Sequence, residues 1–349
     1  MAGSAASVEL TQRQRDILRR VVEEHVKSGQ PVGSKNLVER SELNVSPSTV
    51  RAELGELESL GLLTHAHTSA GRVPTEQGYR FYVDTLLQAS DARPSPLTLD
   101  LTTVRSEVDS ALQATTEMLS QVTHLLALVS APPLETTTIR HVEVLPLQPH
   151  LVMVVVITST GGVTKRMASF EEPVDVGLVS WAAEYLNERV AGHRLGASVV
   201  RQRLEDPALS LSERTFLAAL RPVFTDAVAS EQQQLFVGGA AGLLADFPAD
   251  ELAARHSLLE ALEKRAALLQ ILRAALDPRR PFVRVGEELE NPALRDVALV
   301  GASYGLATRS LGTVSLLGPV RMDYDMAIRS VRAAALELSR FVEDVYAEN

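Results

Sequence analysis

The sequence predicts an α+β multidomain protein, with an N-terminal winged helix-turn-helix followed by an α/β domain that a mostly helical segment interrupts. Two observations carry this prediction. The first 88 residues show three helix patterns and then a short hairpin pattern, which is the order of elements in a winged helix. Beyond a proline-containing stretch, strand patterns give way to helix patterns and then return. We therefore expect a winged helix at 1–88, a linker at 89–97, the first part of the α/β domain at 98–200, an inserted helical domain at 201–280 and the second part at 281–349.

Composition bounds the possible functions. The chain has 349 residues and no cysteine, which excludes disulfides, cysteine-ligated zinc, iron–sulfur clusters and thiol catalysis. Its longest apolar run, Leu151 to Ile157, is too short to cross a bilayer, and residues 1–10 lack the pattern of a signal peptide. We expect a soluble, cytoplasmic protein without a membrane partner.

Net charge alone does not decide whether the chain binds DNA. The total is −10, but residues 1–87 carry 10 basic and 11 acidic side chains, against 24 and 33 in the remainder. DNA binding requires a local positive face and not a basic protein, so an N-terminal DNA-binding domain remains compatible with this distribution.

The N-terminal helix patterns have clear boundaries. Thr11 and Gln14 form a predicted capping box for a helix that continues to about Val26, and Gly29-Gln30-Pro31 ends it. Ser34 can cap a second, short helix. After a turn at 43–45, Ser46 is the predicted cap of a third helix, with Pro47 in its first turn and Gly61 after its end at Leu60. A hairpin follows, with strands at 62–65 and 72–73 and a loop at 68–71, and then a helix at 75–87.

The remainder of the chain alternates between helix and strand patterns. Leu101 to Val129 shows a heptad seam, which predicts a long helix that forms a coiled coil with a partner chain or packs on a neighbouring domain. The other predicted elements are strands at 139–145, 151–157 and 163–170, a helix at 176–190, a mostly helical region at 199–276 that includes a helix at 253–276, strands at 282–285, 297–303 and 312–317, and a helix at 323–346.

The third helix has the features of a DNA-recognition helix. Val50, Leu54 and Leu57 lie on one side with Gly61 continuing it, so this side must face the core. The opposite side carries only small residues, which allow another surface to approach the helix backbone, and Gly55 there costs roughly 1 kcal/mol in helix propensity. Its N-terminal end, where a recognition helix reaches base edges, offers hydroxyls and a guanidinium that can bind a base or a phosphate. The alternative is a three-helix bundle whose small face packs on another protein. The small residues are Ser48, Ala52, Gly55 and Ser59, and they are flanked by Thr49 and Arg51.

The hairpin loop would be the wing. Its hydroxyls, backbone N–H groups and arginine suit a phosphate backbone or the minor groove. His65 and His67 alternate along the strand, but two histidines without a third ligand favour surface positions over a metal site.

No motif indicates catalysis. Gly238-Gly239-Ala240-Ala241-Gly242 is not followed by the Lys-Ser/Thr of a phosphate loop, and Asp323 and Asp325 at the start of a predicted helix favour capping over Mg²⁺ binding. We expect no enzyme activity, cofactor or metal.

Several motifs together resemble the bacterial heat-inducible transcription repressor family HrcA. The resemblance covers nearly the whole chain, with departures at Ala66 and at 52–55. The motifs are Val32-Gly33-Ser34-Lys35, the block from Val45 to Arg51, Leu57-Glu58, the block from His67 to Thr75, Gly78 to Asp84, Val285-Gly286-Glu287-Glu288 and Gly318 to Tyr324.

The resemblance implies a homodimer that binds an inverted-repeat operator, the CIRCE element, upstream of chaperonin and DnaK operons. It implies release of repression by heat, modulation by the GroEL chaperonin, and a GAF-like α/β domain with an inserted dimerisation domain. The DNA-binding residues that we expect are Ser34, Lys35, Ser46, Ser48, Thr49, Arg51, Ala52, Gly55, His67, Thr68, Ser69, Gly71 and Arg72.

Two other functions remain open from the sequence. One is a winged-helix regulator controlled by a small-molecule ligand of the GAF-like domain, which a thermal shift by a metabolite pool would support. The other is a protein-interaction module that does not bind DNA. Retained DNA affinity in an Arg51→Ala, Arg72→Ala double variant would support the latter.

Overall fold

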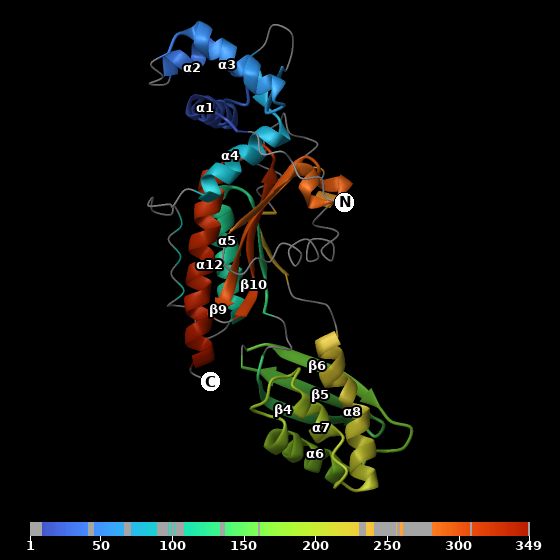
Figure 1. The fold of residues 1–349 in the computed structure, drawn as a ribbon. Coiled ribbons are helices and arrows are strands. Elements are labelled where there is room, and N and C mark those ends of the chain that lie inside the picture. The colour runs from blue at the N-terminus through green and yellow to red at the C-terminus, as the bar shows by residue number, and fades with distance from the viewer. Residues whose placement is uncertain are drawn as a thin grey trace.

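The structure is a computed structural model that describes residues 9–40, 45–65, 71–88, 97, 99, 101, 108–132, 137–159, 161–229, 235–240, 256, 259–260, 281–307 and 309–347. Its three parts follow one another along a long axis (Figure 1). The N-terminal helices and hairpin lie at one end, a five-stranded sheet with two long helices lies in the middle, and a three-stranded sheet with three helices lies at the other end.

The N-terminal part is the predicted winged helix. Both expected caps are present, because Thr11 and Gln14 form a reciprocal capping box and Ser46 Oγ accepts from the Thr49 N–H. Gly29 ends the first helix at φ 66°, a left-handed conformation that glycine adopts without strain. The elements are α1 (Gln12–Ser28), α2 (Ser34–Arg40), α3 (Pro47–Ser59), the antiparallel pair β1 (Leu63–His65) and β2 (Arg72–Pro74), and α4 (Glu76–Gln88). The predicted turn at 43–45 and the linker at 89–97 lie almost entirely outside the described residues.

The middle part is an antiparallel sheet with strand order β7-β3-β10-β9-β8. When the five strands are numbered 1 to 5 in chain order, their spatial order is 2-1-5-4-3. This order fits the GAF-like domain that the resemblance implies. Two helices pack on one face of the sheet, and a second apolar cluster lies on the other face. The elements are α5 (Val108–Thr123), β3 (Leu126–Ser130), β7 (Leu235–Gly238), β8 (Phe282–Val285), the 3-10 turns η2 (Gly286–Leu289) and η3 (Pro292–Leu294), β9 (Val297–Leu306), β10 (Arg309–Pro319) and α12 (Tyr324–Ala347).

The prediction of one helix from Leu101 to Val129 is wrong in its C-terminal part. The helix ends at Thr123, His124 takes φ 55°, and Leu126–Ser130 forms a strand between β7 and β10. A short apolar run of this kind fits a fully buried strand as well as a helix, and here all five residues are buried. The helical part of the seam packs within the chain, against α12 and the sheet.

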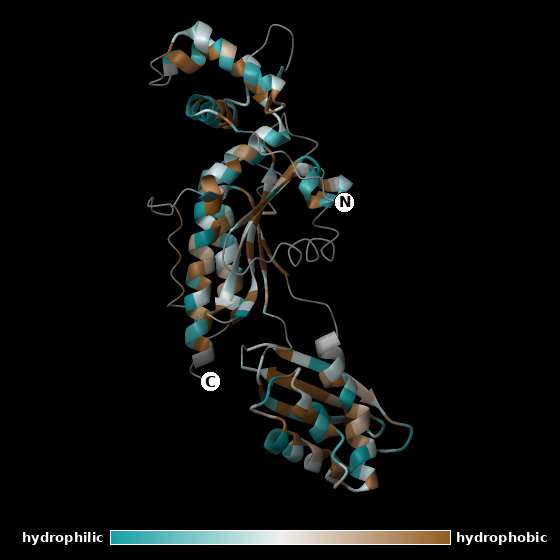
Figure 2. Cartoon of the chain, viewed as in Figure 1, coloured by the Kyte–Doolittle hydropathy of each residue, from teal (hydrophilic) through white to brown (hydrophobic). Residues whose placement is uncertain are grey.

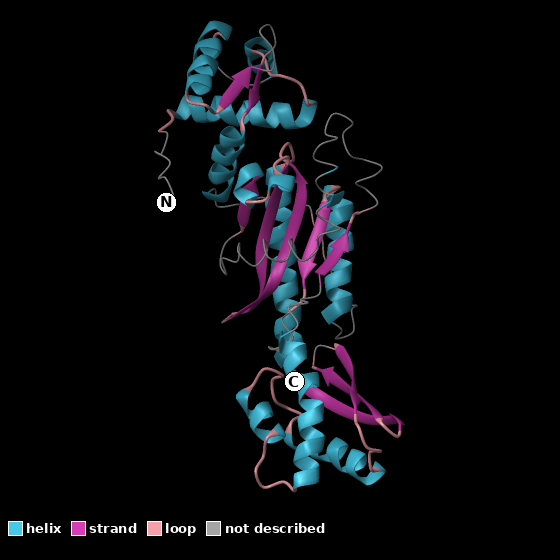
Figure 3. Ribbon diagram, turned by 90° about the vertical axis from the view of Figure 1, so that its right-hand side faces the viewer, coloured by secondary structure: helices cyan, strands magenta, loops and turns pink. Residues whose placement is uncertain are grey.

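The third part interrupts the five-stranded sheet. The chain leaves that sheet after β3 and returns at β7, and the two strands pair directly, with Ala127 opposite Gly238. The residues between them form a separate sheet, β4-β5-β6, with its own apolar core beneath three helices (Figures 1 and 3). The elements are β4 (Ile139–Gln148), β5 (Leu151–Thr158), β6 (Val163–Ser169), α6 (Val176–Arg189), α7 (Ser198–Leu204) and α8 (Leu211–Ala229).

Sheet membership divides the chain differently from the predicted boundaries. The expected start of the insertion, residue 201, falls inside α7, and the three strands expected in the interrupted domain share a core with α6–α8 instead. The interrupting part is therefore mixed α/β and not mostly helical. The predicted helix at 253–276 lies almost entirely outside the described residues.

The other strand and helix predictions are confirmed within a few residues. Asp323 caps α12, since its Oδ1 accepts from the Met326 N–H at 2.9 Å, which is the capping role expected for it. The strands of the five-stranded sheet and strand β5 of the three-stranded sheet are largely apolar (Figure 2). None of the helices in the described ranges is long and apolar enough to cross a membrane.

Candidate nucleic-acid interface

Helix α3 is amphipathic in the predicted sense. Val50, Leu54 and Leu57 are buried, whereas Gly61, expected to continue their side, is exposed after the helix end. On the opposite side, Ser48 and Ala52 are exposed. Gly55 is half-buried, and a Cβ added there would meet nothing within 4 Å in the part of the chain that the structure describes. The outer surface of α3 is therefore open to a close approach by another molecule.

Three hydroxyls gather at the N-terminus of α3. Ser46 Oγ lies 2.7 Å from Ser48 Oγ and 2.9 Å from Thr49 Oγ1, and it also accepts the Thr49 N–H at 3.2 Å. These groups can donate to and accept from a base edge or a phosphate, and the helix dipole adds positive potential at this end.

Arg51 supplies a free positive charge beside these hydroxyls. It is exposed, and it makes no hydrogen bond or ion pair within the part of the chain that the structure describes. By contrast, Glu53, two positions further along the helix, is half-buried and lies 3.5 Å from Arg13 of α1. The N-terminal half of α3 thus presents one unpaired guanidinium, which is the group expected to bind guanine or phosphate.

The wing is anchored to the loop before α2. Backbone bonds join Val32 and Arg72 in both directions, at 2.8 and 2.9 Å. Gly71 packs so closely on this loop that a Cβ would lie 2.4 Å from the Val32 carbonyl, so only glycine fits without a shift. The expected wing-tip contacts His67, Thr68 and Ser69 lie outside the described residues.

Arg72 is held within the domain. Its Nη2 lies 2.8 Å from Glu58 Oε2, and its Nη1 lies 2.5 Å from His65 Nε2. His65 Nδ1 lies 2.6 Å from Glu58 Oε1, so an imidazole with its proton on Nδ1 donates to Glu58 and accepts from Arg72. The Arg72 side chain is 18% exposed, and its guanidinium links α3 to both strands of the wing.

The roles of Glu58 and His65 do not appear among the predictions from the sequence, in which His65 is a surface or metal-binding histidine and Arg72 is a DNA contact. A usable signal was present, since Glu58 lies in the last turn of α3 and His65 and Arg72 stand opposite each other on the paired strands. Opposite and adjacent positions of this kind place side chains within contact distance.

The two expected contacts of α2 differ in exposure. Ser34, the first residue of the helix, is buried at 8% exposure, whereas Lys35 is exposed. Lys35 is therefore available for a phosphate, and Ser34 is part of the packing beneath the interface.

We expect Glu58→Ala to lower the free energy of unfolding by about 1–3 kcal/mol, because it leaves a mostly buried guanidinium without its carboxylate. DNA affinity should fall as the wing loses its link to α3, while Glu58→Gln should lose less of both. Urea denaturation and DNA titration of the full chain measure the two effects. A gain in DNA affinity would show instead that Glu58 restrains Arg72 from binding a phosphate.

A winged helix whose third helix presents a small, open face with an unpaired arginine defines the class of DNA-binding transcription regulators. The sequence profile described as "HrcA protein C terminal domain" matches residues 109–328. The profile "Winged helix-turn-helix transcription repressor, HrcA DNA-binding" matches residues 9–85.

Individual proteins show the same relationship. The chain is 36% identical over 332 residues to a heat-inducible transcription repressor HrcA of Frankia casuarinae, covering 93% of this chain and 97% of the relative. It is 35% identical to that of Acidothermus cellulolyticus, covering 97% and 100%. A crystal structure of a hypothetical protein shares the fold, with a TM-score of 0.65 at 22% identity over 97% of this chain and all of the other.

The chain belongs to the HrcA family of heat-inducible transcription repressors. This is a class of DNA-binding regulators and not of enzymes, in agreement with the sequence analysis.

Proposed function

We propose that the chain binds a CIRCE-type inverted repeat as a homodimer in the bacterial cytoplasm, represses chaperonin and DnaK operons, and is released from the operator on heat shock. The observation that carries this proposal is the open outer surface of α3, where small side chains surround Arg51, which has no partner among the described residues. Membership of the HrcA family supports the choice of operator and the heat response. The resemblance also supports modulation by the GroEL chaperonin.

The expected contact residues divide into two roles in this proposal. Ser48, Thr49 and Arg51 read the bases of one half-site, and Lys35 binds a phosphate. Ala52 and Gly55 let the helix backbone approach the groove, and Ser46 caps the helix and orients its first turn. The remaining predicted contacts within the described ranges, Ser34, Gly71 and Arg72, act by shaping the surface and not by touching DNA.

The three-stranded sheet supports the homodimer. Its helices cover one face, and the opposite face presents an apolar row in which Leu145 pairs with Met153 and Met153 with Met167. Leu145 is 39% and Met167 is 58% exposed. An apolar strand such as β5 is typical of a sheet that is covered on both faces, so we propose that a second copy of the chain covers this one.

Charge on the same face is self-complementary. Glu143 and Lys165 flank Val155 in register, on opposite edges of the sheet. A two-fold axis along β5 would place Glu143 of each copy over Lys165 of the other, as an isologous interface requires. Such a dimer matches an inverted repeat, because each half-site meets one recognition helix.

Fluorescence anisotropy of the full chain with labelled duplexes tests the proposal. At fixed salt, we expect a CIRCE-type repeat to bind at least about a thousandfold more tightly than a scrambled duplex. Equal, weak binding to both would contradict it. Repeating the titration and sedimentation of the protein through an inducing temperature tests the heat response, which requires affinity or dimer content to fall.

Arg51→Ala should weaken operator binding by roughly 1–3 kcal/mol and weaken binding to the scrambled duplex less, if Arg51 reads a base. The free energy of unfolding should not change, because the side chain is exposed and makes no interaction with the described residues. Anisotropy against both duplexes measures the difference. Equal losses on the two would assign Arg51 to a phosphate instead.

A further inference from the structure

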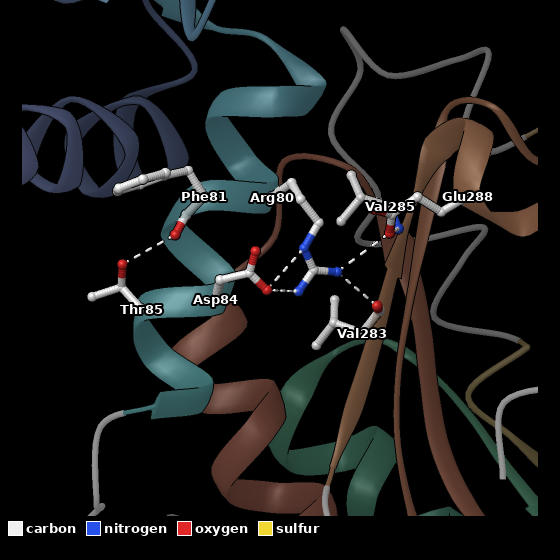
Figure 4. A network of polar contacts seen from close by, with 7 residues as sticks. All are labelled: Arg80, Phe81, Asp84, Thr85, Val283, Val285 and Glu288. Atoms are coloured by element: carbon white, nitrogen blue, oxygen red, sulfur yellow. Dashed lines mark hydrogen bonds and ion pairs between the residues drawn. The ribbon is translucent and has the colours of Figure 1, made fainter. Parts of the chain in front are cut away.

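The winged helix is joined to the five-stranded sheet by Arg80 of α4 (Figure 4). Its Nη1 donates to the Val283 carbonyl of β8 at 2.8 Å and to Glu288 Oε2 of η2 at 3.3 Å. Its Nε and Nη2 donate to Asp84 Oδ1, one turn along α4, at 3.1 and 2.5 Å. One guanidinium therefore bonds to its own helix and to two elements more than 200 residues away.

The acceptors of Arg80 are themselves fixed. Glu288 Oε2 accepts the Val285 N–H at 2.9 Å, which holds the carboxylate at the start of η2, and Val283 is part of the β8–β9 ladder. Burial acts to lower the pKa of Arg80, but the hydrogen bond to Asp84 and the charges of Glu288 and Asp84 outweigh it and raise the pKa. The contact is thus a charged tie between rigid elements.

Two further contacts lie at other points of the same junction. The Glu76 carboxylate at the start of α4 lies against Gly286, where an added Cβ would be 2.6 Å from it. The Arg321 guanidinium lies over Gly29 at the end of α1, where an added Cβ would be 2.0 Å from Nη1. Beneath them, Tyr79 of α4 packs on Tyr324 of α12, with 6.0 Å between ring centroids.

Contacts at three separate points fix the orientation of one rigid body on another, whereas a single covalent connection does not. The apolar core also runs through the junction, since Tyr79, Val83, Val285 and Tyr324 belong to one buried cluster. Helix α3 packs on α1 and is carried with it, so its direction relative to the five-stranded sheet is set at this junction.

We propose that Arg80 is a positioning residue for operator recognition: it holds each recognition helix in the orientation that matches one spacing between the two half-sites. The inference rests on the dimer proposed above. Adding one base pair between half-sites rotates one relative to the other by about 35° and moves it by about 3.4 Å. A winged helix held by Arg80 cannot follow that change. Loss of Arg80 removes both hydrogen bonds that its side chain donates to β8 and η2, which loosens the junction enough for the winged helix to follow it.

The test measures binding of Arg80→Ala to four duplexes: the CIRCE-type repeat, the repeat with one base pair added or removed between half-sites, and a single half-site. We expect the wild-type chain to prefer the original spacing by at least about tenfold. Arg80→Ala should reduce this preference to less than about threefold and lower affinity for the original repeat by about tenfold. Its half-site affinity should stay within about twofold of wild type.

Arg19→Ala is the matched control, because Arg19 makes an ion pair with Glu23 four residues along its helix at 2.7 Å without crossing the junction. It should keep the spacing preference. Glu288→Gln can still accept a hydrogen bond from the Val285 N–H, and it should lose part of the spacing preference. It replaces Arg80→Ala as the test variant if Arg80→Ala does not fold.

Two results would overturn the proposal. One is that Arg80→Ala and Glu288→Gln fold and prefer the original spacing as strongly as the wild-type chain does. The other is that Arg80→Ala loses as much affinity for the single half-site as for the repeat. If the wild-type chain itself fails to prefer the repeat over a half-site, the dimeric function is overturned instead.

Discussion

Gly55→Glu should abolish binding to the inverted repeat, with a loss of at least about 100-fold, or roughly 3 kcal/mol. Gly55 lies on the open side of α3, and an added Cβ would meet no atom of the described residues within 4 Å. The glutamate therefore extends into the space that DNA must occupy, and its carboxylate faces the phosphates. Both effects act against the complex and neither acts against the free protein.

The same substitution should leave the fold intact or stabilise it slightly. Gly55 has ordinary helical backbone angles, and glutamate is favoured over glycine within a helix by up to about 1 kcal/mol. In one sample of the variant, urea denaturation should therefore show an unchanged or higher free energy of unfolding, while anisotropy shows a loss of operator affinity. A variant that merely unfolds cannot produce this combination.

Two substitutions at the same position separate size from charge. Gly55→Ala adds one methyl group and should retain affinity within a few fold, whereas Gly55→Gln matches glutamate in shape without its charge and should fall between the two. Normal operator binding by folded Gly55→Glu would show that this side of α3 does not approach DNA, and the protein-interaction function would become the better explanation.

Local signals predicted the winged helix well. The reciprocal pair Thr11 and Gln14, the cap at Ser46 and the buried positions Val50, Leu54 and Leu57 all depend on residues within one or two turns of each other. Such patterns can be read directly from sequence because the interactions that produce them are local.

Sheet membership could not be predicted in the same way. The strands at 126–130 and 139–148 are separated by eight residues but belong to different sheets, and β3 pairs with β7, more than 100 residues later. The strand pattern of Val152, Val154 and Val156 shows a buried face but not which helices bury it. The domain boundaries therefore depended on tertiary pairing.

The sequence predicted which arginines belong to the candidate site, but it did not predict which of them has a partner within the protein. Arg51 and Arg72 are equally plausible DNA contacts from sequence, and both lie in the motifs that carry the family resemblance. The structure separates them, because Glu58 and His65 converge on Arg72 whereas Arg51 is open. The difference arises from how the wing folds back on α3, so it shows only when the end of α3 and the two strands of the hairpin are considered together.

Met167→Glu should dissociate the proposed dimer, raising its dissociation constant by more than about 100-fold. Met167 is 58% exposed on the open face of the three-stranded sheet, at one end of the row formed with Met153 and Leu145. In a two-fold dimer, each substitution is made twice, and two carboxylates would be buried against apolar side chains without partners. Sedimentation equilibrium across a concentration series measures the change.

Operator affinity should fall together with dimer content. Once the first half-site is bound, a linked second recognition helix is present at an effective concentration of about millimolar, and a monomer loses this advantage. Affinity for a single half-site should not change, because the winged helix and the three-stranded sheet lie at opposite ends of the molecule (Figure 1). The combination of lost repeat binding and retained half-site binding is specific to failed dimerisation.

Leu211→Glu is the matched control within the same part of the chain. Leu211 is 74% exposed at the first position of α8, where a negative charge is favoured by the helix dipole, and α8 packs on the covered side of the sheet. It should leave both the dimer and operator binding unchanged. If Met167→Glu remains as dimeric as Leu211→Glu, the open sheet face is not the interface, and the long helix α5 becomes the next candidate for self-association.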